Sequence, residues 1–242
     1  MMKRNSMALI DAQDDLLEKF NKRYRKKKYT NLTVSFLIIV FGVSSFIYGL
    51  GIDPHIRIFR FMTVDGTVFT TIGSLVYIFI NIFEARHNTE LTSFIAYYIR
   101  LSSSVAEMVI LLVVLLSHLP FNNVSIPMFD RYDSFIMHVV IPALSVISFA
   151  INDSPIGKLT PAKRWHGTWF VTAYAIVILT LVITGTLEQS LIPYIFLDVV
   201  HNPAWVTVLA FVIIYAIAYF MSWLLSEVNR KLSWRWFRGF YR

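Results

Sequence analysis

The stretch FRFMTVDGTVFTTIGS, from Phe59 to Ser74, leads into an apolar run that continues to residue 83. It holds five hydroxyl groups and two glycines, and Asp65 is the single charged residue between positions 61 and 83. About 20 apolar residues are enough to cross the hydrocarbon core of a bilayer as a helix. We therefore expect residues 61–83 to span a membrane, with hydroxyl groups gathered on one helix face.

Further apolar runs of similar length occur at residues 32–51, 97–117, 132–151, 168–187 and 203–225. The 242-residue sequence is 56% hydrophobic and 15% charged, which is more apolar than the core of a soluble protein requires. The pattern predicts an all-α integral membrane bundle of six transmembrane helices over residues 31–227. A basic cytoplasmic tail that can form an amphipathic helix is expected at 1–30, and a basic, aromatic cytoplasmic tail at 228–242.

The distribution of Lys and Arg predicts the orientation of the bundle. Eighteen of these residues lie in the two tails and in the loops after the second and fourth runs. Three lie in the other loops, namely Arg57, Arg60 and Arg131. Because cytoplasmic segments of membrane proteins carry the excess of basic residues, we expect both termini in the cytoplasm. An even number of spans agrees with that arrangement.

The basic N-terminal tail allows two interpretations. Apolar residues recur in it at near-helical spacing, acidic residues come early and lysines come late, which favours a helix on an anionic membrane surface. A solvated basic arm explains the same residues equally well. Neither tail requires nucleic acid as a partner, because basic cytoplasmic segments and interfacial anchors account for their composition.

The polar residues of the run at 61–83 follow steps of four and three and are Thr63, Thr67, Thr70, Ser74, Tyr77 and Asn81. That spacing places them on one helix face, which we expect to point into the bundle because polar groups are costly in lipid. Helix packing explains the stripe without a functional site, since hydroxyls can bond carbonyls of their own helix. Asp65 either caps this helix or orients a catalytic group.

Two charged residues lie inside the run at 97–117. Arg100 is near the expected cytoplasmic end, where Glu84 of the preceding run is its expected ion-pair partner. Glu107 lies two helical turns further along and is protonated, bonded to a hydroxyl, or functional. Together with the polar stripe, Arg100 and Glu107 support a second hypothesis, a transporter or binding protein for a small solute or lipid.

His138 is the one histidine inside an apolar run. A buried histidine is often structural, but histidine is also the natural general base near neutral pH. Pro142 has no N–H to donate to the His138 carbonyl, so we expect a local distortion of the helix beside the imidazole. One such histidine cannot supply the paired axial ligands of a membrane haem, and no metal, nucleotide or GxSxG motif occurs. No cofactor or metal is expected.

Three segments resemble the androgen-induced protein family of six-helix membrane hydrolases, which cleave fatty acid esters of hydroxy fatty acids. They are RFMTVDGTV at 60–68, MHVVIPAL at 137–144 and LIPYIFLDV at 191–199, the last similar to an aromatic-proline segment of the family. The resemblance implies Thr63 as the nucleophile and His138 as the base. The chain departs from the family at 193–196, where it reads Pro-Tyr-Ile-Phe and the family more often has Tyr-Pro-Phe.

A threonine hydroxyl becomes an effective nucleophile when a nearby base removes its proton. In the expected orientation Thr63 and His138 both lie in the outer half of the membrane, with His138 about 6 Å deeper. Asp65, Asp133 and Asp198 lie near the same face, and spacing does not choose which of them orients the imidazole. The remaining candidate pocket residues are Thr67, Asn81, Glu107 and Tyr194.

The leading hypothesis is an intramembrane lipid ester hydrolase that acts on long-chain fatty acyl esters. Such a substrate dissolves in the bilayer and can enter between helices toward apolar walls. The expected partners are therefore the lipid substrate and the bilayer, and a cysteine-free chain rich in Ile and Lys fits a bacterial plasma membrane. In a third hypothesis the protein is a scaffold, and every polar residue in the spans serves packing.

Overall fold

The computed structural model describes residues 2–52, 59, 61–87, 94–118, 131–152, 158–188, 191–198 and 202–237. These residues form helices and short turns, and no strand occurs among them. The elements are, in chain order, α1 (Met2–Ile52), α2 (Met62–His87), α3 (Phe94–His118), α5 (Tyr132–Phe135), the π-helix η2 (Ile136–Val140), α6 (Ile141–Asn152), α7 (Pro161–Arg164), the 3₁₀ helix η3 (Trp165–Thr168), α8 (Trp169–Ile183), the 3₁₀ helix η5 (Ile195–Leu197) and α9 (Ala204–Phe237).

Six helical segments are long and apolar enough to cross a membrane, at residues 25–52, 62–84, 94–113, 132–151, 161–183 and 204–233. The prediction of an all-α bundle with six spans is confirmed. The fifth span starts earlier than expected because Thr160 caps α7 and Pro161 occupies its first turn, where proline is well tolerated. The same span ends near Gly185, whose φ of 69° is typical of a residue that terminates a helix.

Helix α3 is the central helix of the bundle and contacts α2, α6, α8 and α9. Of its span, 67% is buried, against 17–44% for the other spans. Ser102, Ser103 and Ser104 are buried along it, and small side chains of this kind allow helices to approach closely. Gly66 and Gly73 of α2 serve the same purpose, because a Cβ at either position would press on α3 side chains.

The outer surface of the bundle is apolar. Large hydrophobic side chains are exposed on most spans, for example Phe36, Ile47, Phe79, Ile95, Ile176, Val208 and Val212. A soluble monomer rarely exposes apolar surface on this scale, whereas helices in contact with lipid require it. The chain is therefore a multi-pass integral membrane protein.

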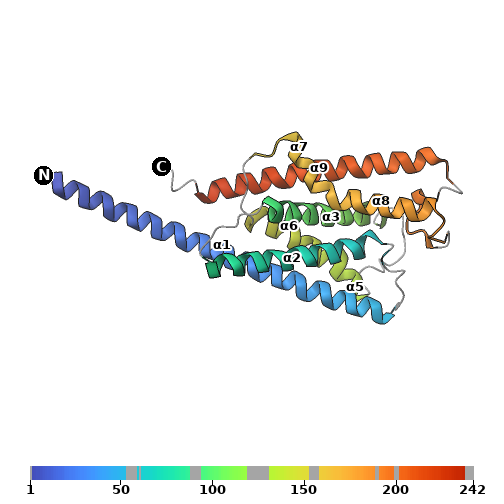
Figure 1. Cartoon of the computed structure of the whole chain (residues 1–242), viewed down its shortest axis with the longest axis horizontal. Helices are drawn as coiled ribbons and strands as arrows, with labels where there is room; N and C mark the ends of the chain where they lie inside the picture. The colour runs from blue at the N-terminus through green and yellow to red at the C-terminus, as the bar shows by residue number, and fades with distance from the viewer. Residues whose placement is uncertain are drawn as a thin grey trace.

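The first residues of α1 and the last residues of α9 lie at the same end of the bundle (Figure 1). We call this the terminal end, and the opposite end the far end. Helix α1 is unbroken from Met2 to Ile52, and its N-terminal part continues beyond the bundle in the direction of the first span (Figure 1). Residues 2–30 thus continue the helix of span 1, and α9 likewise runs on to Phe237.

Candidate active site at the far end of the bundle

The side chains of Thr63 and His138 meet at the far end of the bundle. Thr63 is the second residue of α2, and His138 is the central residue of η2. The Thr63 Oγ1 atom lies 3.2 Å from the His138 Nε2 atom, in a partly buried position. The difference in depth expected from the run boundaries therefore does not separate the two groups, which are 75 positions apart in the sequence.

The hydrogen bonds of the second ring nitrogen of His138, Nδ1, determine the tautomer of the ring and therefore the role of Nε2. The Nδ1 atom lies 2.8 Å from the backbone oxygen of Ser134 and 3.2 Å from the Ser134 hydroxyl. Because a carbonyl oxygen can only accept a hydrogen bond, the Nδ1 atom carries the hydrogen of the neutral ring. The Nε2 atom then has a free electron pair, and the Thr63 hydroxyl donates to it.

The π-helix around His138 explains the position of the ring. The N–H of Ile141 donates to the carbonyl of Ile136, five residues earlier, where an α-helix would use the residue four earlier. Pro142 cannot donate to the carbonyl of His138, so an α-helical register would leave that carbonyl without its usual donor. The distortion expected from Pro142 therefore takes the form of a π turn, a geometry frequent at functional sites.

Two of the candidate orienting carboxylates, Asp133 and Asp65, lie close to His138 and Thr63 along the chain. Asp133 accepts two hydrogen bonds from Arg131, at 3.1 and 2.7 Å, and these bonds raise the pKa of the Arg131 guanidinium. Asp65 is half-buried on α2, and no described hydrogen bond joins Asp65 or Asp133 to His138. Ser134 thus occupies the place expected for a carboxylate, and its spacing of four from His138 was the available signal.

Tyr194, from the segment between α8 and α9, closes the site beside Thr63. Its hydroxyl oxygen accepts a 3.2 Å hydrogen bond from the backbone N–H of Met62, the residue before Thr63. Its ring stacks on Phe196 with 5.4 Å between centroids and an interplanar angle of 7°. Asp198 follows η5 in the same segment, and its backbone oxygen accepts from the N–H of Asn202. The aromatic-proline segment therefore lies at the candidate nucleophile.

The polar stripe of α2 faces α3 and meets Glu107 there. Glu107 is fully buried, and its Oε1 atom accepts a 2.8 Å hydrogen bond from the Thr70 hydroxyl. The Oε2 atom of Glu107 and the hydroxyl of Thr67 are buried without a hydrogen-bond partner in the described part of the chain. Thr67 and Thr70 lie one and two turns deeper along α2 than Thr63, and no hydrogen bond among the described residues joins Glu107 to Thr63.

Arg100 is buried, and its hydrogen-bond partners differ from the ion-pair partner expected from the sequence. The guanidinium donates to Ser148 at 2.9 Å, to Asn31 at 3.3 Å and to Ser74 at 3.4 Å, and it lies 5.4 Å from the ring centroid of Tyr77. The expected ion pair between Arg100 and Glu84 is wrong. Glu84 instead pairs with Lys28 at 3.3 Å, because α1 runs beside the end of α2 and brings a cation closer to the surface.

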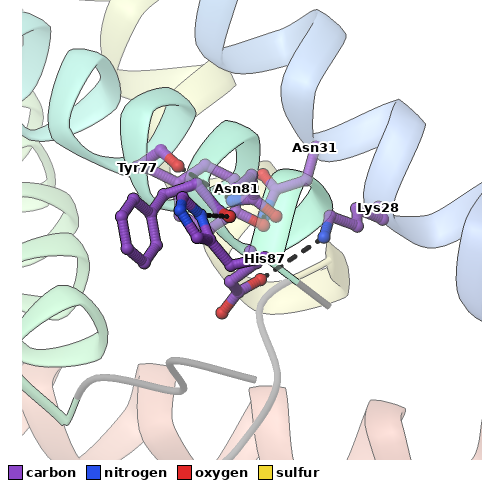
Figure 2. Close-up of polar contacts among 7 residues, drawn as sticks. Lys28, Asn31, Tyr77, Asn81 and His87 are labelled. Carbon is purple, nitrogen blue, oxygen red and sulfur yellow. Dashed lines mark hydrogen bonds and ion pairs between the residues drawn. The ribbon is translucent and has the colours of Figure 1, made fainter. Parts of the chain in front are cut away.

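Asn81 belongs to the terminal end of the bundle. Its amide donates to the backbone oxygen of Tyr77 at 2.8 Å, and the Tyr77 hydroxyl accepts from Asn31 at 2.7 Å. Figure 2 shows these residues beside Lys28 and His87. Thr63 is 18 residues away along the same helix, which is about 27 Å, so Asn81 lies outside the candidate site.

Thr63, His138 and Tyr194 thus form the centre of the candidate site, Asp65 and Asp133 lie near it, and Thr67 and Glu107 lie deeper. Within the described ranges no three His, Asp or Glu side chains lie close enough together to hold a metal ion. Comparison of the sequence with family models, with curated proteins and with solved structures gives no match. The resemblance to the androgen-induced protein family accordingly rests on the three quoted segments.

Proposed function

We propose that the protein is an intramembrane lipid ester hydrolase in which Thr63 is the nucleophile and His138 the general base. The observation that carries this proposal is the 3.2 Å contact between Thr63 Oγ1 and His138 Nε2. A hydroxyl within hydrogen-bond reach of a base that is oriented by a third group is the arrangement expected for nucleophilic catalysis. The Ser134 carbonyl supplies that orientation at 2.8 Å.

The reaction has two stages in this proposal. The Thr63 oxygen attacks the ester carbonyl carbon while its proton passes to His138 Nε2. The tetrahedral intermediate then expels the alcohol, which takes the proton from His138, and leaves an acyl group on Thr63. Water then attacks the acyl carbon while His138 accepts a proton from it. The bond from this carbon to the Thr63 oxygen breaks, His138 returns the proton to that oxygen, and the products are a carboxylic acid and free Thr63.

The position of the pair suits a substrate that partitions between lipid and water. Thr63 begins its span, so its hydroxyl is near the polar boundary of the membrane while the apolar spans extend beside it. Long-chain fatty acyl esters can place the acyl chain along these spans and the ester at the boundary. The family resemblance adds fatty acid esters of hydroxy fatty acids as the substrate class. The distribution of basic residues favours a site in the outer half of the membrane, and the cysteine-free composition rich in Ile and Lys favours a bacterial plasma membrane.

The test is hydrolysis of p-nitrophenyl palmitate and of a fatty acid ester of a hydroxy fatty acid by the purified protein in nanodiscs. Thr63→Ala and His138→Ala should each lower kcat/KM by about 10²–10⁴-fold. Thr180→Ala is the matched control, because its hydroxyl is exposed and bonds only the Ile176 carbonyl in the described structure. Full activity in either site variant would remove that residue from the mechanism.

A second candidate function is transport of a small solute or lipid, and one observation favours it. Glu107 is fully buried, and one of its carboxyl oxygens has no partner among the described residues. Intramembrane carboxyls in such positions often bind protons or solutes. Proton-coupled uptake into liposomes that is lost in Glu107→Gln but kept in Thr63→Ala would favour transport over hydrolysis.

A further inference from the structure

Tyr194 is held against the backbone immediately before the candidate nucleophile. Met62 is the first residue of α2, so its N–H has no acceptor within the helix. The Tyr194 hydroxyl oxygen accepts this N–H at 3.2 Å. The contact places a phenol next to Thr63 even though the two residues come from different spans and loops.

The hydrogen-bond pattern leaves the Tyr194 proton available. Tyr174 lies beside Tyr194, close enough to act on its pKa. Because the Tyr194 oxygen accepts the N–H of Met62, that bond does not use the Tyr194 O–H, which can donate to a further acceptor. No described hydrogen bond joins Tyr194 to Asp65, the carboxylate whose charge acts on the pKa of Tyr194.

Tyr194 also stays protonated at neutral pH. Burial raises the pKa of Tyr194, and the nearby Asp65 raises it further, although the bonds from Met62 and Tyr174 act in the opposite direction. A phenol that keeps its proton is a hydrogen-bond donor, which a phenolate is not. The parallel stack on Phe196, at 5.4 Å between centroids, holds the ring in one orientation.

We propose that Tyr194 is a third catalytic residue, which donates a hydrogen bond to the carbonyl oxygen of the ester as Thr63 attacks the carbonyl carbon. This inference rests on the proposed hydrolase function and supplies the oxyanion donor that the Thr63–His138 pair lacks. Negative charge develops on the carbonyl oxygen in the tetrahedral intermediate, and a fixed donor stabilises that charge most in a site with little water. The proton stays on Tyr194 throughout, so no further acid or base is needed.

The geometry allows one ester group to reach both residues. The Tyr194 hydroxyl is fixed at the amide of Met62, and Thr63 follows directly in the chain. A carbonyl bond is about 1.2 Å long, and an oxyanion donor lies about 2.7–3.1 Å from the oxygen. In this proposal the carbon lies against Thr63 while its oxygen faces Tyr194.

The experiment compares Tyr194→Phe with Tyr219→Phe in the full-length protein, with p-nitrophenyl palmitate as the probe. Tyr194→Phe keeps the ring and its stack but loses the donor, so kcat should fall by about 10²-fold with little change in KM. Tyr219→Phe removes an exposed hydroxyl that bonds the Pro161 carbonyl away from the site, and it should stay close to the parent activity. The ratio of the parent kcat to the Tyr194→Phe kcat should be much smaller with a thionoester analogue than with the oxygen ester, because the thionoester sulfur is a poor hydrogen-bond acceptor.

The outcomes separate this inference from the proposed function. A folded Tyr194→Phe variant with unchanged kcat would overturn the role of Tyr194, while inactive Thr63→Ala and His138→Ala variants would still support a hydrolase. A Thr63→Ala variant as active as the parent would overturn both. If Tyr194→Phe fails to fold, 3-fluorotyrosine at position 194 replaces it, because it keeps the shape and strengthens the donor. A raised kcat then supports the role, and an unchanged kcat rejects it.

Discussion

The Nδ1 atom of His138 lies 2.8 Å from the backbone oxygen of Ser134, one turn earlier in the same span. The acceptor is a backbone atom, so a side-chain substitution at Ser134 that keeps the helix also keeps this bond. The Ser134 hydroxyl lies further away, at 3.2 Å. The orientation of the imidazole therefore depends mainly on the local backbone and less on any one neighbouring side chain.

Ser134→Ala tests this dependence on the backbone. The variant loses the 3.2 Å contact but keeps the 2.8 Å bond to Nδ1, so ester hydrolysis should stay within a few-fold of the parent. Steady-state kinetics in nanodiscs measure the effect, with Ser226→Ala as a control because the Ser226 hydroxyl bonds the backbone oxygen of Trp223 on α9. A loss as large as that of His138→Ala would mean that the hydroxyl, and not the carbonyl, holds the ring.

Pro142→Ala tests the π turn. An alanine supplies the N–H that Pro142 lacks, so the chain can form an α-helical bond to the His138 carbonyl and lose the π turn. His138 would then rotate away from Thr63, and a displacement of about 1 Å can lower activity by about 100-fold. Kinetics should show this loss without a fall in thermal stability.

The control for Pro142→Ala is Pro161→Ala, at the exposed start of α7 and remote from the site. This variant should keep parent activity. Equal activity in Pro142→Ala and the parent would show that the π turn persists without the proline or does not position the imidazole.

Gly167→Ala tests the close approach of η3 to α9. A Cβ at Gly167 would collide with the side chain of Ser222, and such overpacking costs about 1–3 kcal/mol. Gly51→Ala is the matched control, because nothing lies within 4 Å of a Cβ there and alanine is the better helix former by about 1 kcal/mol. Thermal unfolding in detergent should therefore shift down for Gly167→Ala and stay equal or rise for Gly51→Ala.

The six spans were predictable because length and hydropathy alone decide which segments can cross a membrane. The contact between Thr63 and His138 was expected from the family resemblance, and the polar stripe of α2 pointed to its inward face. Ser134 was missed because its acceptor is a backbone oxygen, which residue type does not reveal, so that the spacing of four from His138 was the one signal. The π turn was expected only as a distortion, since Pro142 removes one hydrogen bond without specifying how the helix responds.

The pairing of charges was less predictable. Arg100 and Glu84 lie near the same end of neighbouring spans, and sequence offered no better partner for either. In the structure Glu84 forms an ion pair with Lys28, and Arg100 donates hydrogen bonds to Asn31, Ser74 and Ser148. The partners come from α1, α2 and α6, so the outcome depended on how these helices pack around Arg100 and Glu84, and composition does not encode that packing.

Glu107→Gln tests the state of the buried carboxyl. The glutamine oxygen can still accept from Thr70, which now donates to Oε1 at 2.8 Å, so stability should change by less than about 1 kcal/mol. Because no cation is among its described partners, we expect Glu107 to be a neutral carboxylic acid. Infrared spectra of the parent should then contain a protonated-carboxyl band that Glu107→Gln lacks. Identical spectra in this region would show that the carboxyl is ionised.

Single cysteines test the expected orientation, because the chain has no cysteine of its own. Lys19 is exposed on the extension of α1 at the terminal end, and Thr186 is exposed just after the fifth span, at the far end. If both termini are cytoplasmic, a membrane-impermeant maleimide should label Thr186→Cys on intact cells and Lys19→Cys only after permeabilisation. Ser104→Cys, which is buried, should resist labelling in both conditions. The reverse pattern for the first two variants would place Thr63 and His138 at the cytoplasmic face. The water that attacks the acyl-threonine would then enter from the cytoplasm.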